Sequence, residues 1–114
     1  MSLLILSSLT SAWARQGWYL MTPPPVKGKP NESAPLSKWN QTGSYDSVAE
    51  CQRKINKLKE LWNNEGKKYD EQAKISPDPN QREKVLFGSK MAGVLYLQYK
   101  AARCISIDDP SLKP

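Results

Sequence analysis

Few residues in this 114-residue chain could carry out chemistry, because the chain contains no histidine. Histidine is the commonest general base near neutral pH and the commonest side-chain ligand of metals. The sequence also lacks a glycine-rich phosphate loop and a serine-centred nucleophile motif. It therefore predicts no cofactor, no metal site and no catalytic residue, and it favours a protein that is not an enzyme.

Paired carboxylates are the one catalytic route that needs no histidine, since two acids can cleave a glycosidic bond. Glu50 and Asp108 are the first pair to consider, because each lies within four residues of a cysteine. They would have to face each other across a cleft, with one of them desolvated. Asp108 and Asp109 precede Pro110; two adjacent carboxylates are too few for a calcium loop and suit a turn.

The two cysteines, Cys51 and Cys104, are the other reactive side chains. An even number of cysteines in an exported chain is typical of a disulfide. A Cys51–Cys104 bond would close a loop of about fifty residues and, on chain-entropy grounds, stabilise the fold by about 4 kcal/mol. The alternative is two buried thiols in a cytosolic protein, so the prediction depends on export.

The first fourteen residues indicate export. They carry no charge, include the apolar run Leu3–Leu6 and end in Ala12-Trp13-Ala14, the pattern of small residues that a signal peptidase reads. We expect residues 1–14 to be a cleaved signal peptide and residues 15–114 to be one periplasmic or secreted domain, with no membrane span after cleavage. No Lys or Arg precedes the apolar run, and a short buried N-terminal helix is the alternative.

The elements that would position these residues begin with short strands. Residues 17–22 are aromatic and aliphatic and stop at three consecutive prolines, which cannot continue a strand ladder. Residues 22–37 read as an extended, Pro-rich loop; a Pro-rich ligand for an aromatic groove is the alternative. A second strand is expected at 39–45 and a third at 102–107, around Cys104.

Two helices are expected between these strands. Asp46 or Ser47 can cap a helix over 47–65, in which apolar residues recur at steps of three and four from Val48 to Trp62. Gly66 is its expected end, and the alternatives are that residues 67–75 extend the helix or form a separate turn. Asp78 and Pro79 can start a second helix over 80–98. Residues 91–99 are almost continuously apolar and would suit a buried helix or a strand; we favour the helix.

The predicted fold class is therefore α+β: a small two- or three-stranded sheet packed against two helices and closed by one disulfide. The bond would tie the start of the first helix to the last strand.

The surface is expected to be mildly basic. Lys and Arg number 17 against 11 Asp and Glu, a net charge of +6 that is spread along the chain. A concentrated basic patch, the usual footprint of nucleic-acid binding, is missing from the sequence, so no specific nucleic acid is expected. Trp39 and Trp62 are expected to fill the core, the alternative being a stacking surface for single strands or sugars.

Three segments carry a resemblance: Trp18-Tyr19-Leu20-Met21 before Pro23-Pro24, a lone Trp39 ahead of a helix with Cys51, and Ala102-Arg103-Cys104-Ile105 running into Asp108-Asp109-Pro110. Together they resemble a family of uncharacterised small exported bacterial proteins. The C-terminal motif, residues 102–113, is the specific part, although the family often has a basic residue where Ser111 stands here. Residues 63–100 show no match. The resemblance implies export and the disulfide, and it brings no activity.

The sequence thus predicts a non-catalytic structural or interaction protein of the cell envelope. Its partner is unknown, and an envelope protein is the first to look for. The alternative is a weak binder of anionic polymers, such as nucleic acid or envelope polyanions, through a basic surface that contains aromatic residues.

Overall fold

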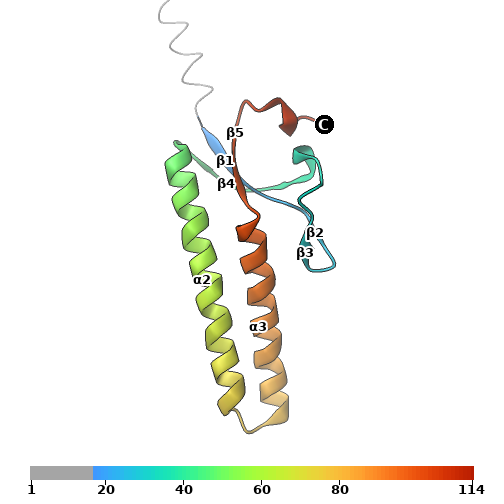
Figure 1. The fold of residues 1–114 in the computed structure, drawn as a ribbon, viewed down its shortest axis with the longest axis vertical. Coiled ribbons are helices and arrows are strands. Elements are labelled where there is room, and N and C mark those ends of the chain that lie inside the picture. The colour runs from blue at the N-terminus through green and yellow to red at the C-terminus, as the bar shows by residue number, and fades with distance from the viewer. Residues whose placement is uncertain (1–16) are drawn as a thin grey trace, which may run out of the picture.

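A computed structural model describes residues 17–114 of the chain (Figure 1). The proposed signal peptide and its cleavage point after Ala14 lie outside the described residues. The fold is α+β, as predicted, and combines a three-stranded sheet, a two-stranded sheet and two long helices. The elements in chain order are β1 (Trp18–Thr22), β2 (Pro25–Val26), β3 (Lys29–Pro30), the 3-10 turn η1 (Leu36–Lys38), β4 (Asn40–Tyr45), α2 (Val48–Ile75), α3 (Pro79–Lys100), β5 (Arg103–Ser106) and the 3-10 turn η2 (Pro110–Leu112).

The larger sheet has β1 at its centre, paired antiparallel with β4 on one side and β5 on the other. All three strands begin and end within two residues of their predicted bounds. The register of the β1–β4 pair shifts between Leu20 and Met21, and the Thr42 hydroxyl donates a hydrogen bond to the Leu20 carbonyl, 3.2 Å away. Because side chains alternate along a strand, Leu20 and Met21 face opposite sides of the sheet, and both are buried.

The core lies where the start of α2 meets the face of the sheet that carries Leu20. Leu20, Cys51 and Ile55 form its fully buried centre, and the side chains packed around it include Tyr45, Tyr99 and Cys104. The predicted disulfide is present between Cys51 and Cys104, whose Cα atoms are 6.1 Å apart. It fixes the first turn of α2 to β5, as expected.

The two helices form an antiparallel hairpin that projects from the sheet (Figure 1). The sequence predicts a sheet that packs against both helices, but the contact is confined mainly to one of them. Helix α2 touches all three strands of the larger sheet, whereas α3 contacts β3 of the small β-hairpin. The reason is length. A helix of 28 residues spans about 42 Å, while a strand of six residues spans about 20 Å. Most of the hairpin therefore has no sheet to cover.

The expected helix end at Gly66 is wrong, and the alternative in which residues 67–75 extend the helix is confirmed, because α2 continues to Ile75. A glycine inside a helix costs about 1 kcal/mol relative to alanine. Packing beyond it compensates: Ala73 is buried, and Tyr69 lies against Gly88 of α3. Both predicted N-caps are present, since Ser47 Oγ accepts a hydrogen bond from Glu50 N and Asp78 Oδ1 accepts one from Asn80 N.

The helical interpretation of residues 91–99 is confirmed, because α3 runs without interruption to Lys100. The Pro-rich segment, predicted to be an extended loop, contains a small hairpin of β2 and β3. Its turn residues, Lys27 and Gly28, have φ of 55° and 78°, the paired positive values of a type I′ turn. This turn is hard to predict from the sequence, because its usual signature is Asn-Gly or Asp-Gly rather than Lys-Gly.

Candidate interaction surface

Helix α3 is apolar on more than one side. Its side toward α2 is marked by Ala92, which is buried near Gly66, and by Ser89, whose hydroxyl donates to Asp70 Oδ1 over 2.6 Å. At 100° per residue, Phe87 falls on the opposite side of the helix. We call that side the outer face of α3. A helix that is apolar all round is ordinarily buried all round.

The outer face of α3 carries large apolar side chains that are open to water. Phe87 is 65% exposed, and the three others on this face are Leu86 at 49%, Met91 at 43% and Leu97 at 40%. Among the aromatic residues at positions 17–114, Phe87 is the one whose side chain is exposed. Exposed apolar groups that gather on one face of a small protein often mark an interaction site.

The β2–β3 hairpin covers one end of this face. A Cβ atom built at Gly28 would be 3.9 Å from Val94 Cγ2, and Gln98 Nε2 donates a hydrogen bond to the Pro23 carbonyl. Figure 1 shows the hairpin beside the half of α3 nearer the sheet, with no neighbour on that side of the far half. The uncovered stretch holds Leu86, Phe87 and Met91, which we call the distal patch.

Basic side chains border the distal patch. Lys84 and Lys90 are exposed on the same helix, each three residues from Phe87, and Glu83 is the one acidic residue of α3. Lys27 and Lys29 are exposed on the hairpin next to Val94. The surface around the patch is therefore apolar at its centre and mainly positive at its edge.

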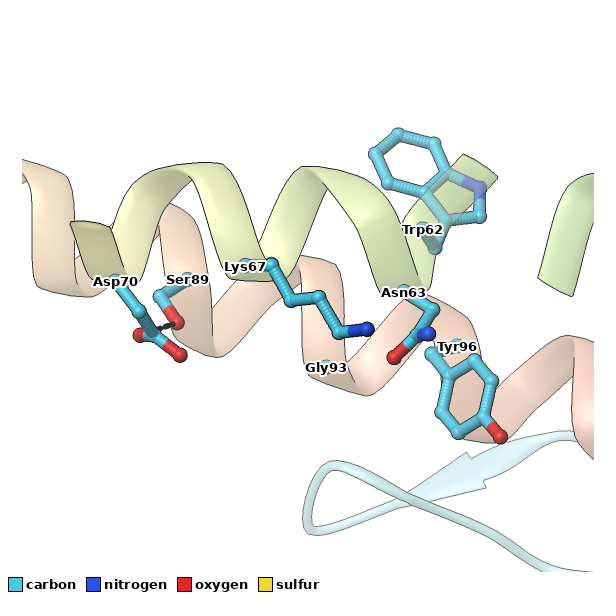
Figure 2. Close-up of a pocket in the computed structure, with 8 residues that line it drawn as sticks. Trp62, Asn63, Lys67, Asp70, Ser89, Gly93 and Tyr96 are labelled. Atoms are coloured by element: carbon cyan, nitrogen blue, oxygen red, sulfur yellow. Dashed lines mark hydrogen bonds between the residues drawn. The ribbon is translucent and has the colours of Figure 1, made fainter. Parts of the chain in front are cut away.

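A second surface feature is a shallow groove of about 180 Å³ along the seam between α2 and α3 (Figure 2). Its lining residues are Trp62, Asn63, Gly66, Lys67, Asp70, Ser89, Gly93 and Tyr96. The Asp70–Ser89 hydrogen bond closes one end, and in the view Trp62 and Tyr96 point to opposite sides of Asn63. Because the rings of Trp62 and Tyr96 point away from each other, the groove offers no pair of aromatic faces for stacking.

The carboxylates singled out from the sequence do not form a desolvated pair. Glu50 is exposed in the first turn of α2, and Asp108 is exposed in the turn after β5. Asp109 takes the turn-forming role, since its Oδ1 accepts a hydrogen bond from Ser111 N over 2.9 Å at the start of η2. Within residues 17–114, no three cysteine, aspartate or glutamate side chains gather in a way that could hold a metal ion.

The tryptophans expected in the core divide between two environments. Trp39 is 6% exposed, donates from Nε1 to the Ala34 carbonyl over 2.9 Å, and lies 5.0 Å from the Arg103 guanidinium. Trp62 is half-buried beside the interhelical groove. Arg103 and Trp39 thus join β5 to the start of β4 by a cation–π contact.

Neither α2 nor α3 combines the length and the apolar character that crossing a bilayer requires. No protein-family model, curated protein or solved structure matches the chain. A function must therefore be inferred from the chain's own surface.

Proposed function

We propose that this protein is a non-catalytic interaction protein of the cell envelope, periplasmic or secreted, which binds a partner through the outer face of α3. The observation that carries the proposal is the exposure of Phe87, Leu86 and Met91 on a helix whose other apolar side is already packed against α2. A single-domain protein with a small core has no folding reason to place there the most exposed aromatic ring of residues 17–114. Binding would bury it.

Export is supported by two features of the chain. The disulfide between Cys51 and Cys104 belongs to an oxidising compartment, since such bonds are rare in the cytosol. The uncharged N-terminal stretch with its Ala12-Trp13-Ala14 end suits a signal peptide. The resemblance to small exported bacterial proteins agrees with both.

The disulfide also suits a binding role, because it holds the helical hairpin of α2 and α3 in one position relative to the sheet. Cys51 is fully buried in the first turn of α2, and its bond to Cys104 of β5 holds the base of the α2–α3 hairpin against the sheet. A surface that is held in place before binding loses less conformational entropy when the partner arrives.

Affinity capture from an envelope extract tests the proposal. The immobilised wild-type protein and an Ile75→Ser control are expected to retain the same partner, because Ile75 is 81% exposed but lies on α2. A Phe87→Ser, Met91→Ser double variant is expected to retain about tenfold less, the loss typical of removing central interface residues. Equal capture by the two variants would contradict the proposal.

A second candidate is weak binding of anionic polymers, and the sparse ion pairing of the surface favours it. Within residues 17–114 one salt bridge forms, between Lys68 Nζ and Glu65 Oε1 at 3.6 Å, so most cationic groups face water. Binding to heparin or to single-stranded DNA would then fall steeply as salt rises. Binding that the Phe87→Ser, Met91→Ser variant loses, at constant salt, would instead favour the first proposal.

A further inference from the structure

We infer that the partner presents an acidic amphipathic helix, which packs lengthwise on the distal patch of α3 as the third helix of a bundle. This inference rests on the proposed function and adds the chemistry of the partner.

The outer face of α3 has the spacing of a helix–helix seam. Phe87, Met91 and Val94 follow one another at steps of four and three, the pattern that places side chains against a neighbouring helix. A second row on the same helix, Ala92 and Gly88, already packs against α2. Helix α3 therefore has the sequence of a helix that lies between two neighbours. One neighbour is α2, and the β2–β3 hairpin covers part of the side where the other would lie.

The hairpin defines where the missing neighbour would lie. It occupies the seam at Val94, where Gly28 approaches the valine side chain, and leaves the seam open from Glu83 to Met91. This stretch is about 13 Å long, or two and a half turns. Because the hairpin stands out beside it (Figure 1), the surface is stepped. A helix that ends against the hairpin fits the step, whereas a flat lipid surface would meet the hairpin before reaching the whole patch.

The charges around the patch indicate the sign of the charge that the partner carries. Lys84 and Lys90 flank Phe87, and Lys27 and Lys29 lie on the β2–β3 hairpin. Glu83, the one acid of α3, lies at the end of the open seam, one turn before Phe87, so four cationic groups outnumber one carboxylate around the patch. Acidic side chains beside the partner's apolar stripe would meet these lysines, which favours association and fixes the orientation.

The same charges argue against a second copy of this chain. In a symmetric antiparallel pair centred on Phe87, Lys84 of one copy falls opposite Lys90 of the other, because both lie three residues from Phe87. Like charges across an interface oppose association.

Photo-cross-linking in the native host tests the inference. Phe87 is replaced by p-benzoylphenylalanine in the full chain, and Ile75 is replaced in the same way in a control strain. After irradiation of intact cells, the adducts are digested and the attached peptide is sequenced by mass spectrometry. The expected product at position 87 is a peptide of another protein with net negative charge and apolar residues three and four apart, in about tenfold higher yield than at position 75.

A charge-reversal pair adds a second readout. Lys84→Glu with Lys90→Glu is expected to lower the adduct yield at position 87 about fivefold or more. Lys68→Glu with Lys74→Glu is the matched control, because it reverses two exposed lysines six residues apart on α2 and is expected to leave the yield unchanged.

The products distinguish failure of the inference from failure of the proposed function. A lipid adduct, an adduct to this chain's own sequence, or a basic or non-helical segment of another protein would overturn the acidic helix. An adduct yield at position 87 no higher than at position 75 would overturn the inference and the proposed function together.

Discussion

The Tyr69 ring on α2 lies directly over Gly88 on α3, so that a Cβ atom added at Gly88 would be 2.8 Å from Tyr69 Cε1. This close approach sets how the two helices meet beyond Gly66. Gly93, one and a half turns further along α3, has nothing within 4 Å of the corresponding position. The two glycines therefore have opposite roles in the same helix.

Substituting the two glycines is expected to change stability in opposite directions. Gly88→Ala must displace the Tyr69 ring and is expected to lower the free energy of unfolding by about 1–3 kcal/mol. Gly93→Ala gains helix propensity without a clash and is expected to raise it by up to about 1 kcal/mol. Urea denaturation measures both. In a Tyr69→Ala background, Gly88→Ala is expected to become stabilising; destabilisation there would show that the ring contact is not the cause.

The disulfide is expected to contribute strongly to stability. Cys104→Ala opens the loop to Cys51 and is expected to lower the free energy of unfolding by about 2–4 kcal/mol. The native protein is expected to show no thiol that reacts with a maleimide under denaturing conditions. Two titratable thiols in protein isolated without reductant would refute the pairing in the cell.

Export is expected to remove residues 1–14. Protein recovered from the periplasm should then begin at Arg15, because Ala12 and Ala14 supply the small residues that a signal peptidase requires. Intact-mass analysis decides the matter. A species that still begins at Met1 would contradict the signal peptide and remove one support for an envelope role.

Catalysis by Glu50 and Asp108 is expected to be undetectable. A carboxylic acid that serves as a general acid needs a desolvated environment, and both side chains are exposed. A screen of glycoside substrates with wild type, Glu50→Gln and Asp108→Asn is expected to show no turnover above buffer. Turnover that either substitution abolishes, with the circular dichroism spectrum unchanged, would establish an enzyme.

The sequence was most informative where local chemistry decides structure. Ser47 and Asp78 mark the two helix starts, because their side chains accept hydrogen bonds from backbone N–H groups of the first turn, which have no partner within the helix. The strand around Trp18 ends at prolines that cannot donate to a ladder. Gly66 does not end the helix as expected, because the packing of Tyr69 and Ala73 further along the chain outweighs the low helix propensity of glycine.

The candidate surface was beyond the reach of sequence reasoning for a physical reason. The apolar run from Met91 to Tyr99 was visible, and burial was the natural expectation for it. Which of its sides is covered depends on α2 and on the β2–β3 hairpin, whose turn has an unusual Lys-Gly sequence. The exposure of Phe87 and Met91 follows only from how far those neighbours extend.

The two methionines of residues 17–114, Met21 and Met91, allow a direct test of whether the outer face of α3 is covered in the cell. Met91 is 43% exposed and Met21 is 4% exposed, and oxidation of methionine to its sulfoxide follows access to the oxidant. With mild peroxide, the purified protein is expected to oxidise at Met91 and to resist at Met21. In intact cells, the binding account predicts that Met91 is protected nearly as well as Met21. Oxidation of Met91 in cells at the rate seen in the purified protein would contradict it.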